Sequence, residues 1–303
     1  FPSLALMLMA FGLDWNISGI AISLAAGLGA SIYLFRLIAV FASPSQALFT
    51  VTLFSVAPTS PMLQLAYAES LQMFFIAVSL YYLTQHRYGL VVIFGTVLAF
   101  TRPGALALAL TVLLHAIVRF AQRSRDPFPT QERVTVLLTA VWLAVAGLAW
   151  PVIAALVTGI PSAYFDTELA WRSAYIGYVE LVPFTPWILG AQWWAQTQWN
   201  MPELWAYVAL GGVVAFGILL LLLPAARRLG TDIRLWCLSY GLYVLAVFRA
   251  RTPLPALVSL RAPPVSLIAA QSRMPSVTEN VWSAVSVIGR GKSWPELSKA
   301  ALM

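Results

Sequence analysis

The chain has 303 residues, of which 60% are hydrophobic and only 10% are charged, and its formal net charge is +7. A soluble domain carries about a quarter charged residues, so this composition excludes an ordinary water-soluble protein. The positive charge does not indicate nucleic-acid binding, because much of it lies in residues 249–303, with seven basic and two acidic groups.

Apolar runs recur along the chain and predict an all-α fold, a polytopic bundle of transmembrane helices. In chain order the expected spans are 17–40, 46–63, 66–84, 88–101, 103–120, 134–158, 204–224 and 232–248. Residues 1–12 are also apolar but too few to cross a membrane unaided. We therefore expect one transmembrane domain, residues 1–248, with about eight spans and an outer segment at 159–203.

The chain changes character after Phe248. Prolines interrupt residues 249–303 repeatedly, and the apolar runs between them are too short to span a bilayer. We expect this basic, Pro-rich tail to be poorly ordered or to lie at the membrane interface.

The charges of the loops predict which ends of the helices face the cytoplasm. Loop 119–133 has four arginines against two acidic residues, and loop 225–234 has three against one. Basic loops stay on the cytoplasmic side, so segment 159–203 is expected outside. Counting back along the chain leaves Arg36 and the His86-Arg87 loop inside, and Asp14, Glu69 and Arg102 at outer helix ends.

Two short motifs at the expected outer face contain charged residues. Ala66-Tyr67-Ala68-Glu69-Ser70-Leu71 opens a helix after the prolines at 58 and 61. A glutamate in a first helical turn can simply stabilise the helix dipole, or it can bind a ligand. In Thr101-Arg102-Pro103-Gly104, Arg102 lies near membrane depth and needs a partner. It could neutralise Glu69, or it could present its guanidinium to a phosphate.

The outer segment combines aromatic and polar residues. Thr158-Gly159 leads into Ala163-Tyr164-Phe165-Asp166, and Glu168, Trp171 and Arg172 follow. Four more tryptophans, at 187, 193, 194 and 199, alternate with glutamines. Interfacial tryptophans anchor membrane proteins, but rings beside amides also suit a sugar, whose faces stack while its hydroxyls form hydrogen bonds.

In combination, Tyr67-Ala68-Glu69-Ser70-Leu71, Thr101-Arg102-Pro103-Gly104, Ala163-Tyr164-Phe165 and Ala170-Trp171-Arg172 resemble the PIG-V type of membrane mannosyltransferase. These are GPI mannosyltransferase II and its actinobacterial relatives. Phe1-Pro2 is similar to the family's Phe-Pro stretch after the first outer loop. The resemblance covers roughly residues 1–248.

The resemblance implies a GT-C fold with an active site at the outer face. It also implies transfer of mannose from a polyprenyl-phosphate donor to a glycolipid acceptor, with the lipid-linked sugar as co-substrate and no cofactor. The residues expected to bind these substrates are Tyr67, Glu69, Arg102, Asp166, Glu168, Trp171 and Arg172. The family's catalytic base is an aspartate that would lie upstream of Phe1, so no catalytic residue is assigned, and these 303 residues alone are expected to bind donor but transfer little.

Two other functions remain open from the sequence. Multispan proteins with charges at the outer face are often transporters or flippases, although no acidic residue falls in the middle of an expected span. A non-catalytic membrane subunit is the third possibility. No metal site is expected, since His86 and His115 stand isolated on the inner side. The expected location is the bacterial cytoplasmic membrane, or the endoplasmic reticulum if the source is eukaryotic.

Overall fold

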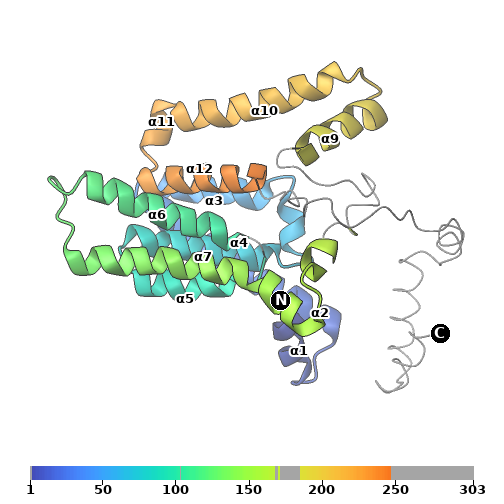
Figure 1. Ribbon diagram of the computed structural model, residues 1–303, viewed down its shortest axis with the longest axis horizontal. Coiled ribbons are helices and arrows are strands. Elements are labelled where there is room, and N and C mark those ends of the chain that lie inside the picture. Colours follow the sequence, from blue (N-terminus) through green and yellow to red (C-terminus); the bar gives the residue numbers. More distant parts are fainter. Residues whose placement is uncertain (1, 103, 168–169, 171–184, 247–303) are drawn as a thin grey trace, which may run out of the picture. The chain divides into compact units, whose positions relative to one another are not determined.

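The computed structural model of the chain describes residues 2–102, 104–167, 170 and 185–246. The chain divides into two units, Phe1–Arg251 and Thr252–Met303, and all the described residues belong to the first. The expected tail, 249–303, therefore lies outside the described residues. Within the described ranges every regular element is helical, which confirms the all-α class (Figure 1).

Helices follow one another with short connections (Figure 1). They are α1 (Pro2–Met9), α2 (Trp15–Ala39), α3 (Pro44–Val56), the 3₁₀ turn η1 (Ser60–Leu63), α4 (Glu69–Thr84), α5 (Tyr88–Ala99), α6 (Ala105–Ala121), α7 (Thr130–Thr158), α9 (Thr185–Trp193), the π-helical turn η2 (Trp194–Gln198), α10 (Leu204–Leu222), α11 (Pro224–Arg227) and α12 (Thr231–Ala246). Three of them, α2, α7 and α10, are long and apolar enough to cross a membrane, while α5 and α6 are shorter apolar helices.

The predicted span at 46–63 is wrong in length. Helix α3 ends at Val56 after 13 residues, and η1 follows as a separate turn. Ala57 is extended, with ψ of 148°, because the ring of Pro58 excludes the helical conformation in the residue before it. Two closely spaced prolines therefore break what hydropathy reads as one continuous segment.

Asp14 has a local structural role. Its carboxylate accepts a hydrogen bond of 2.9 Å from the backbone N–H of Asn16 and caps the first turn of α2. The helix dipole favours a negative charge at this end. The acidic residue that follows α1 is thus explained by helix capping alone.

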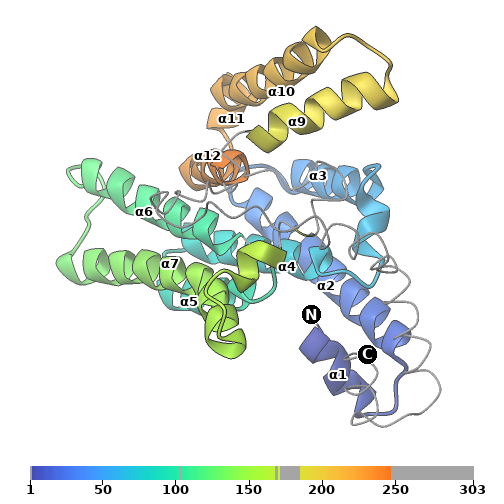
Figure 2. The same ribbon diagram turned by 45° about the vertical axis from the view of Figure 1, so that its right-hand side comes forward.

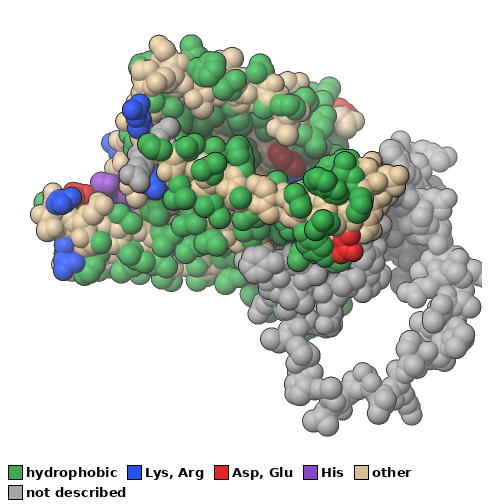
Figure 3. Space-filling model, turned by 90° about the horizontal axis from the view of Figure 1, so that it is seen from above, with side chains coloured by type: hydrophobic (Ala, Val, Ile, Leu, Met, Phe, Trp, Pro, Cys, Tyr) green, Lys and Arg blue, Asp and Glu red, His purple; other side chains and the backbone are tan. Residues whose placement is uncertain are grey.

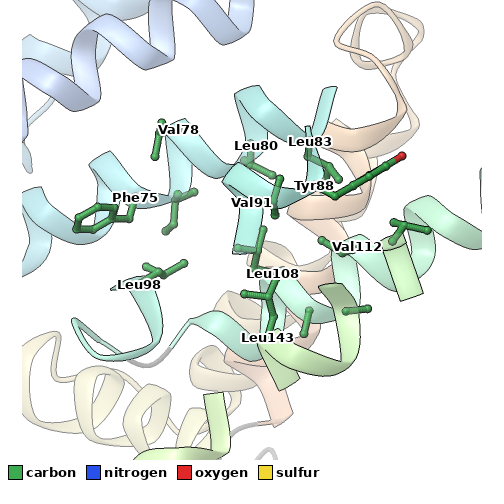
Figure 4. Packing of buried hydrophobic residues seen from close by; sticks show 14 of the residues in the cluster. Phe75, Val78, Leu80, Leu83, Tyr88, Val91, Leu98, Leu108, Val112 and Leu143 are labelled. Carbon is green, nitrogen blue, oxygen red and sulfur yellow. The ribbon is translucent and has the colours of Figure 1, made fainter. Parts of the chain in front are cut away.

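The core lies among α4, α5, α6 and α7, whose facing side chains interlock in Figure 4. α4 packs on both α2 and α5, and α6 packs on both α7 and α12. The labelled core side chains are Phe75, Val78, Leu80, Leu83, Tyr88, Val91, Leu98, Leu108, Val112 and Leu143. Their contacts fix the rotation of each helix, and therefore decide which polar residues at the helix ends meet.

Small residues let these helices approach closely. A Cβ on Gly147 of α7 would lie 3.0 Å from Cγ of Leu106 and 3.2 Å from its backbone nitrogen. Close backbone approach through glycine is a common way for membrane helices to pack. The contact involves backbone atoms, which cannot rotate away from an added methyl group.

Gly147→Ala is therefore expected to destabilise the fold, by about 1–3 kcal/mol, through overpacking between α6 and α7. Gly211→Ala is the matched control, since no atom lies within 4 Å of a Cβ there. In a helix interior the control should be neutral or stabilise by up to about 1 kcal/mol. Denaturant unfolding in detergent, followed by tryptophan fluorescence, measures both; equal midpoints would contradict the close packing.

Large apolar side chains remain exposed on the long helices, among them Leu28, Val145 and Val213. Figure 3 shows hydrophobic side chains spread over the face seen there, while Lys and Arg side chains gather near its left end. That end corresponds to the connection from α6 to α7 in Figure 1. Long apolar helices with apolar outward faces indicate a membrane protein.

Candidate functional site

Glu69 is the first residue of α4, where the chain turns from η1 into the bundle. The turn is held by Ser70, whose hydroxyl donates a 2.6 Å hydrogen bond to the carbonyl of Leu63. The hydroxyl of Ser23 on α2 donates to the carbonyl of Tyr67 at 3.2 Å. These contacts fix the backbone on both sides of Glu69, while the Tyr67 ring itself is exposed.

Arg102 lies in the connection between α5 and α6, and its backbone N–H bonds the carbonyl of Leu98. Its Nη2 lies 2.7 Å from Oε1 of Glu69, an ion pair across 33 positions of sequence. The side chain of Arg102 is 47% exposed and that of Glu69 is 28% exposed, so the guanidinium keeps free donors facing outward. Glu69 and Arg102 thus belong to one site.

The second oxygen of Glu69, Oε2, is buried and has no hydrogen-bond partner. A buried carboxylate oxygen without a donor is costly, so it favours binding of a ligand that supplies one. Gln72 lies one turn further along α4 and is buried. Its Nε2 is 3.3 Å from the place that a Cβ on Gly104 would occupy, so glycine leaves the amide room.

The Glu69 site, as we call Glu69, Gln72, Arg102 and Gly104, therefore combines a carboxylate, an amide and a cation. It can accept hydrogen bonds through Oε2 and donate them through the guanidinium. Sequence analysis did not identify Gln72. The available signal was its spacing of three residues from Glu69, which places both on one helix face.

The other expected binding residues are not joined to this site by any printed contact among the described residues. Asp166 is exposed, and its carboxylate accepts a 2.5 Å hydrogen bond from the hydroxyl of Ser162. Glu168, Trp171 and Arg172 lie outside the described residues. The expected convergence is therefore observed for Glu69 and Arg102.

Aromatic and amide groups do gather on α9, η2 and α10. The rings of Trp193 and Trp199 both contact Trp194, with centroids 5.4 and 6.2 Å away. Nearby, Glu203 accepts hydrogen bonds from Gln192 at 2.6 Å and Tyr207 at 2.8 Å. The amide expected to contact a sugar is thus partly engaged by protein groups.

A second polar cluster, which the sequence did not predict, lies at the opposite ends of α4, α5 and α6. Nδ1 of His115 lies 2.6 Å from Oδ1 of Asp232, at the start of α12. Nε2 of His115 lies 3.2 Å from the hydroxyl of Tyr88. His115 is buried, so these two contacts tie α12 to α5 and α6.

Arg119 extends the same cluster toward α7. Its Nη1 donates to Oε1 of Glu132 at 2.6 Å, and its Nη2 lies 3.1 Å from Asp126. Tyr88 also donates to Glu132, at 2.9 Å. We call Tyr88, His115, Arg119, Glu132 and Asp232 the inner network.

His86 lies beside the inner network, so the expectation that His86 and His115 stand isolated is wrong. Their rings lie 5.7 Å apart, and Nη1 of Arg119 lies 3.0 Å from Nδ1 of His86. Burial lowers the pKa of His86, and the charge of Arg119 lowers it further. A neutral ring can accept a hydrogen bond from Arg119. No cluster of metal-ligating side chains occurs among the described residues.

Comparisons with known proteins add no relative to this geometry. No family model matches the chain, and neither the curated proteins nor the solved structures contain a match. Function therefore has to be argued from the Glu69 site and from the motifs that surround it.

Proposed function

We propose that this chain is a multispan membrane glycosyltransferase of the GT-C type, which transfers mannose from a polyprenyl phosphate to a glycolipid acceptor. The observation that carries the proposal is the pairing of Glu69 with Arg102, together with the unpartnered Oε2 of Glu69. Both residues come from the motifs that resemble the PIG-V family. Their pairing brings two of those motifs into one site.

The chemistry of the transfer assigns a task to each side chain of the Glu69 site. The acceptor hydroxyl oxygen bonds to the anomeric carbon, the bond from that carbon to phosphate breaks, and the phosphate leaves with the electron pair. The exposed donors of Arg102 stabilise the charge on the leaving phosphate. Oε2 of Glu69 and the amide of Gln72 orient sugar hydroxyls. We assign no catalytic base, which must take the hydroxyl proton.

The proposal includes a direction in the membrane. Glu69 and Arg102 lie at one end of α4, α5 and α6, whereas the connections rich in arginine lie at the other. The positive-inside rule then supports an outer position for the Glu69 site in a bacterial cytoplasmic membrane, or a lumenal position in the endoplasmic reticulum.

This topology predicts the accessibility of single cysteines. With Cys237 replaced by alanine, Ser162→Cys should react with an impermeant maleimide from outside, and Arg125→Cys only after the membrane is opened. Both positions are exposed, so each should label once the reagent reaches it. Labelling of Ser162→Cys from the cytoplasmic side alone would contradict an outer site.

Enzyme activity is tested with the full gene product in membranes. Radiolabelled polyprenyl-phosphate mannose should give a labelled glycolipid that is absent when the gene is deleted. Label that crosses the membrane without forming a glycosidic bond would instead identify a transporter or flippase. No labelled product and no bound donor would overturn the proposal and favour a non-catalytic subunit.

A further inference from the structure

A pocket of about 330 Å³ lies between the last turns of α10 and the first turns of α12. Five of its seven lining residues are leucine or isoleucine, among them Leu222, Leu235 and Leu238. Thr231 and Arg234 supply its polar groups. Figures 1 and 2 both show α10 joined to α12 through the short α11. The pocket is thus an apolar space with one cation in its wall.

The charge of Arg234 is not neutralised by the described residues. Its Nε is buried without a hydrogen-bond partner, and no ion pair joins it to a described carboxylate. The acidic residue two positions earlier, Asp232, is already bound to His115 at 2.6 Å. A guanidinium in an apolar wall is stabilised most by an anion that replaces its lost hydration.

The position of the pocket narrows the class of anion. It lies beside α11, and the arginine-rich end of the bundle includes the exposed Arg228. Basic groups at the ends of apolar helices lie at the depth of lipid headgroups. An occupant should therefore have a phosphate for Arg234 and a hydrocarbon chain for the leucines.

We propose that the α10–α12 pocket binds an anionic membrane phospholipid, with its phosphate at Arg234 and an acyl chain against Leu222, Leu235 and Leu238. A free phosphate would leave the apolar lining unused. A zwitterionic lipid carries its own cation, which Arg234 repels. The proposal goes beyond glycosyl transfer and does not depend on it.

Native mass spectrometry of the detergent-purified protein tests the site with phosphatidylglycerol and phosphatidylcholine of identical acyl chains. The wild type should bind phosphatidylglycerol roughly five- to tenfold more tightly, since one basic group near an anionic headgroup has about that effect. Arg234→Gln should remove the preference. The matched control, Arg228→Gln, makes the same charge change outside the pocket and should retain it.

A second variant tests the acyl chain. Leu238→Trp, which fills the apolar part of the pocket, should weaken binding of phosphatidylglycerol while gel filtration and the unfolding midpoint stay near wild type. Equal preference in Arg234→Gln and wild type would overturn the proposal. So would binding of inorganic phosphate as tight as that of the lipid, or unchanged lipid binding by Leu238→Trp.

Discussion

Arg102→Ala is expected to reduce glycosyl transfer from a polyprenyl-phosphate donor by about ten- to a hundredfold, the effect of losing one hydrogen bond to a charged group. The loss should be seen in kcat/KM for the donor, because the exposed guanidinium next to Glu69 is the group proposed to hold the phosphate. Transfer assays with increasing donor concentration measure it in full-length protein.

A double variant separates this role from a purely structural ion pair. If Arg102 only neutralises Glu69, the uncharged pair Glu69→Gln with Arg102→Gln should recover activity that each single variant loses. If Arg102 binds phosphate, the double variant should remain at least as impaired as Arg102→Gln. Arg87→Ala, at the opposite helix ends, should leave kcat/KM unchanged. Wild-type kinetics in Arg102→Ala would reduce this arginine to a counter-ion.

Arg119→Leu is expected to destabilise the fold by about 3–5 kcal/mol, the cost of breaking a buried ion pair on one side. Arg119 is only 7% exposed and holds Glu132 at 2.6 Å, so its removal leaves that carboxylate with the hydroxyl of Tyr88 as its remaining donor. Unfolding in detergent, followed by the fluorescence of the 12 tryptophans, gives the change in free energy.

Arg125→Leu is the matched control for this experiment. It removes the same charge from the same connection, but its side chain is exposed and makes no printed contact among the described residues. It should change stability by less than about 0.5 kcal/mol. The pair Arg119→Leu with Glu132→Leu should recover part of the loss, because two apolar residues leave no buried charge behind. Equal effects of the two arginine variants would show that the inner network does not hold α5, α6 and α7 together.

The sequence by itself determined the helical class and the separation of charges. Hydropathy located helices at each expected span, because a run of apolar residues is a local property of the chain. It failed at 46–63, where Pro58 breaks α3 through a steric effect that hydropathy does not contain. The outcome at α3 shows that span length depends on backbone geometry as well as on composition.

Only the tertiary structure decided which polar groups meet. His115 and Asp232 are separated by 117 positions, and their contact requires α12 to pack against α6. Gln72 reaches Gly104 because the core contacts of α4 fix its rotation toward the start of α6. The sequence gave Glu69 and Arg102 as separate charges near one membrane depth. Packing of the helices made them a pair and left one carboxylate oxygen without a partner, since side-chain contacts between helices depend on rotation and register rather than on spacing along the chain.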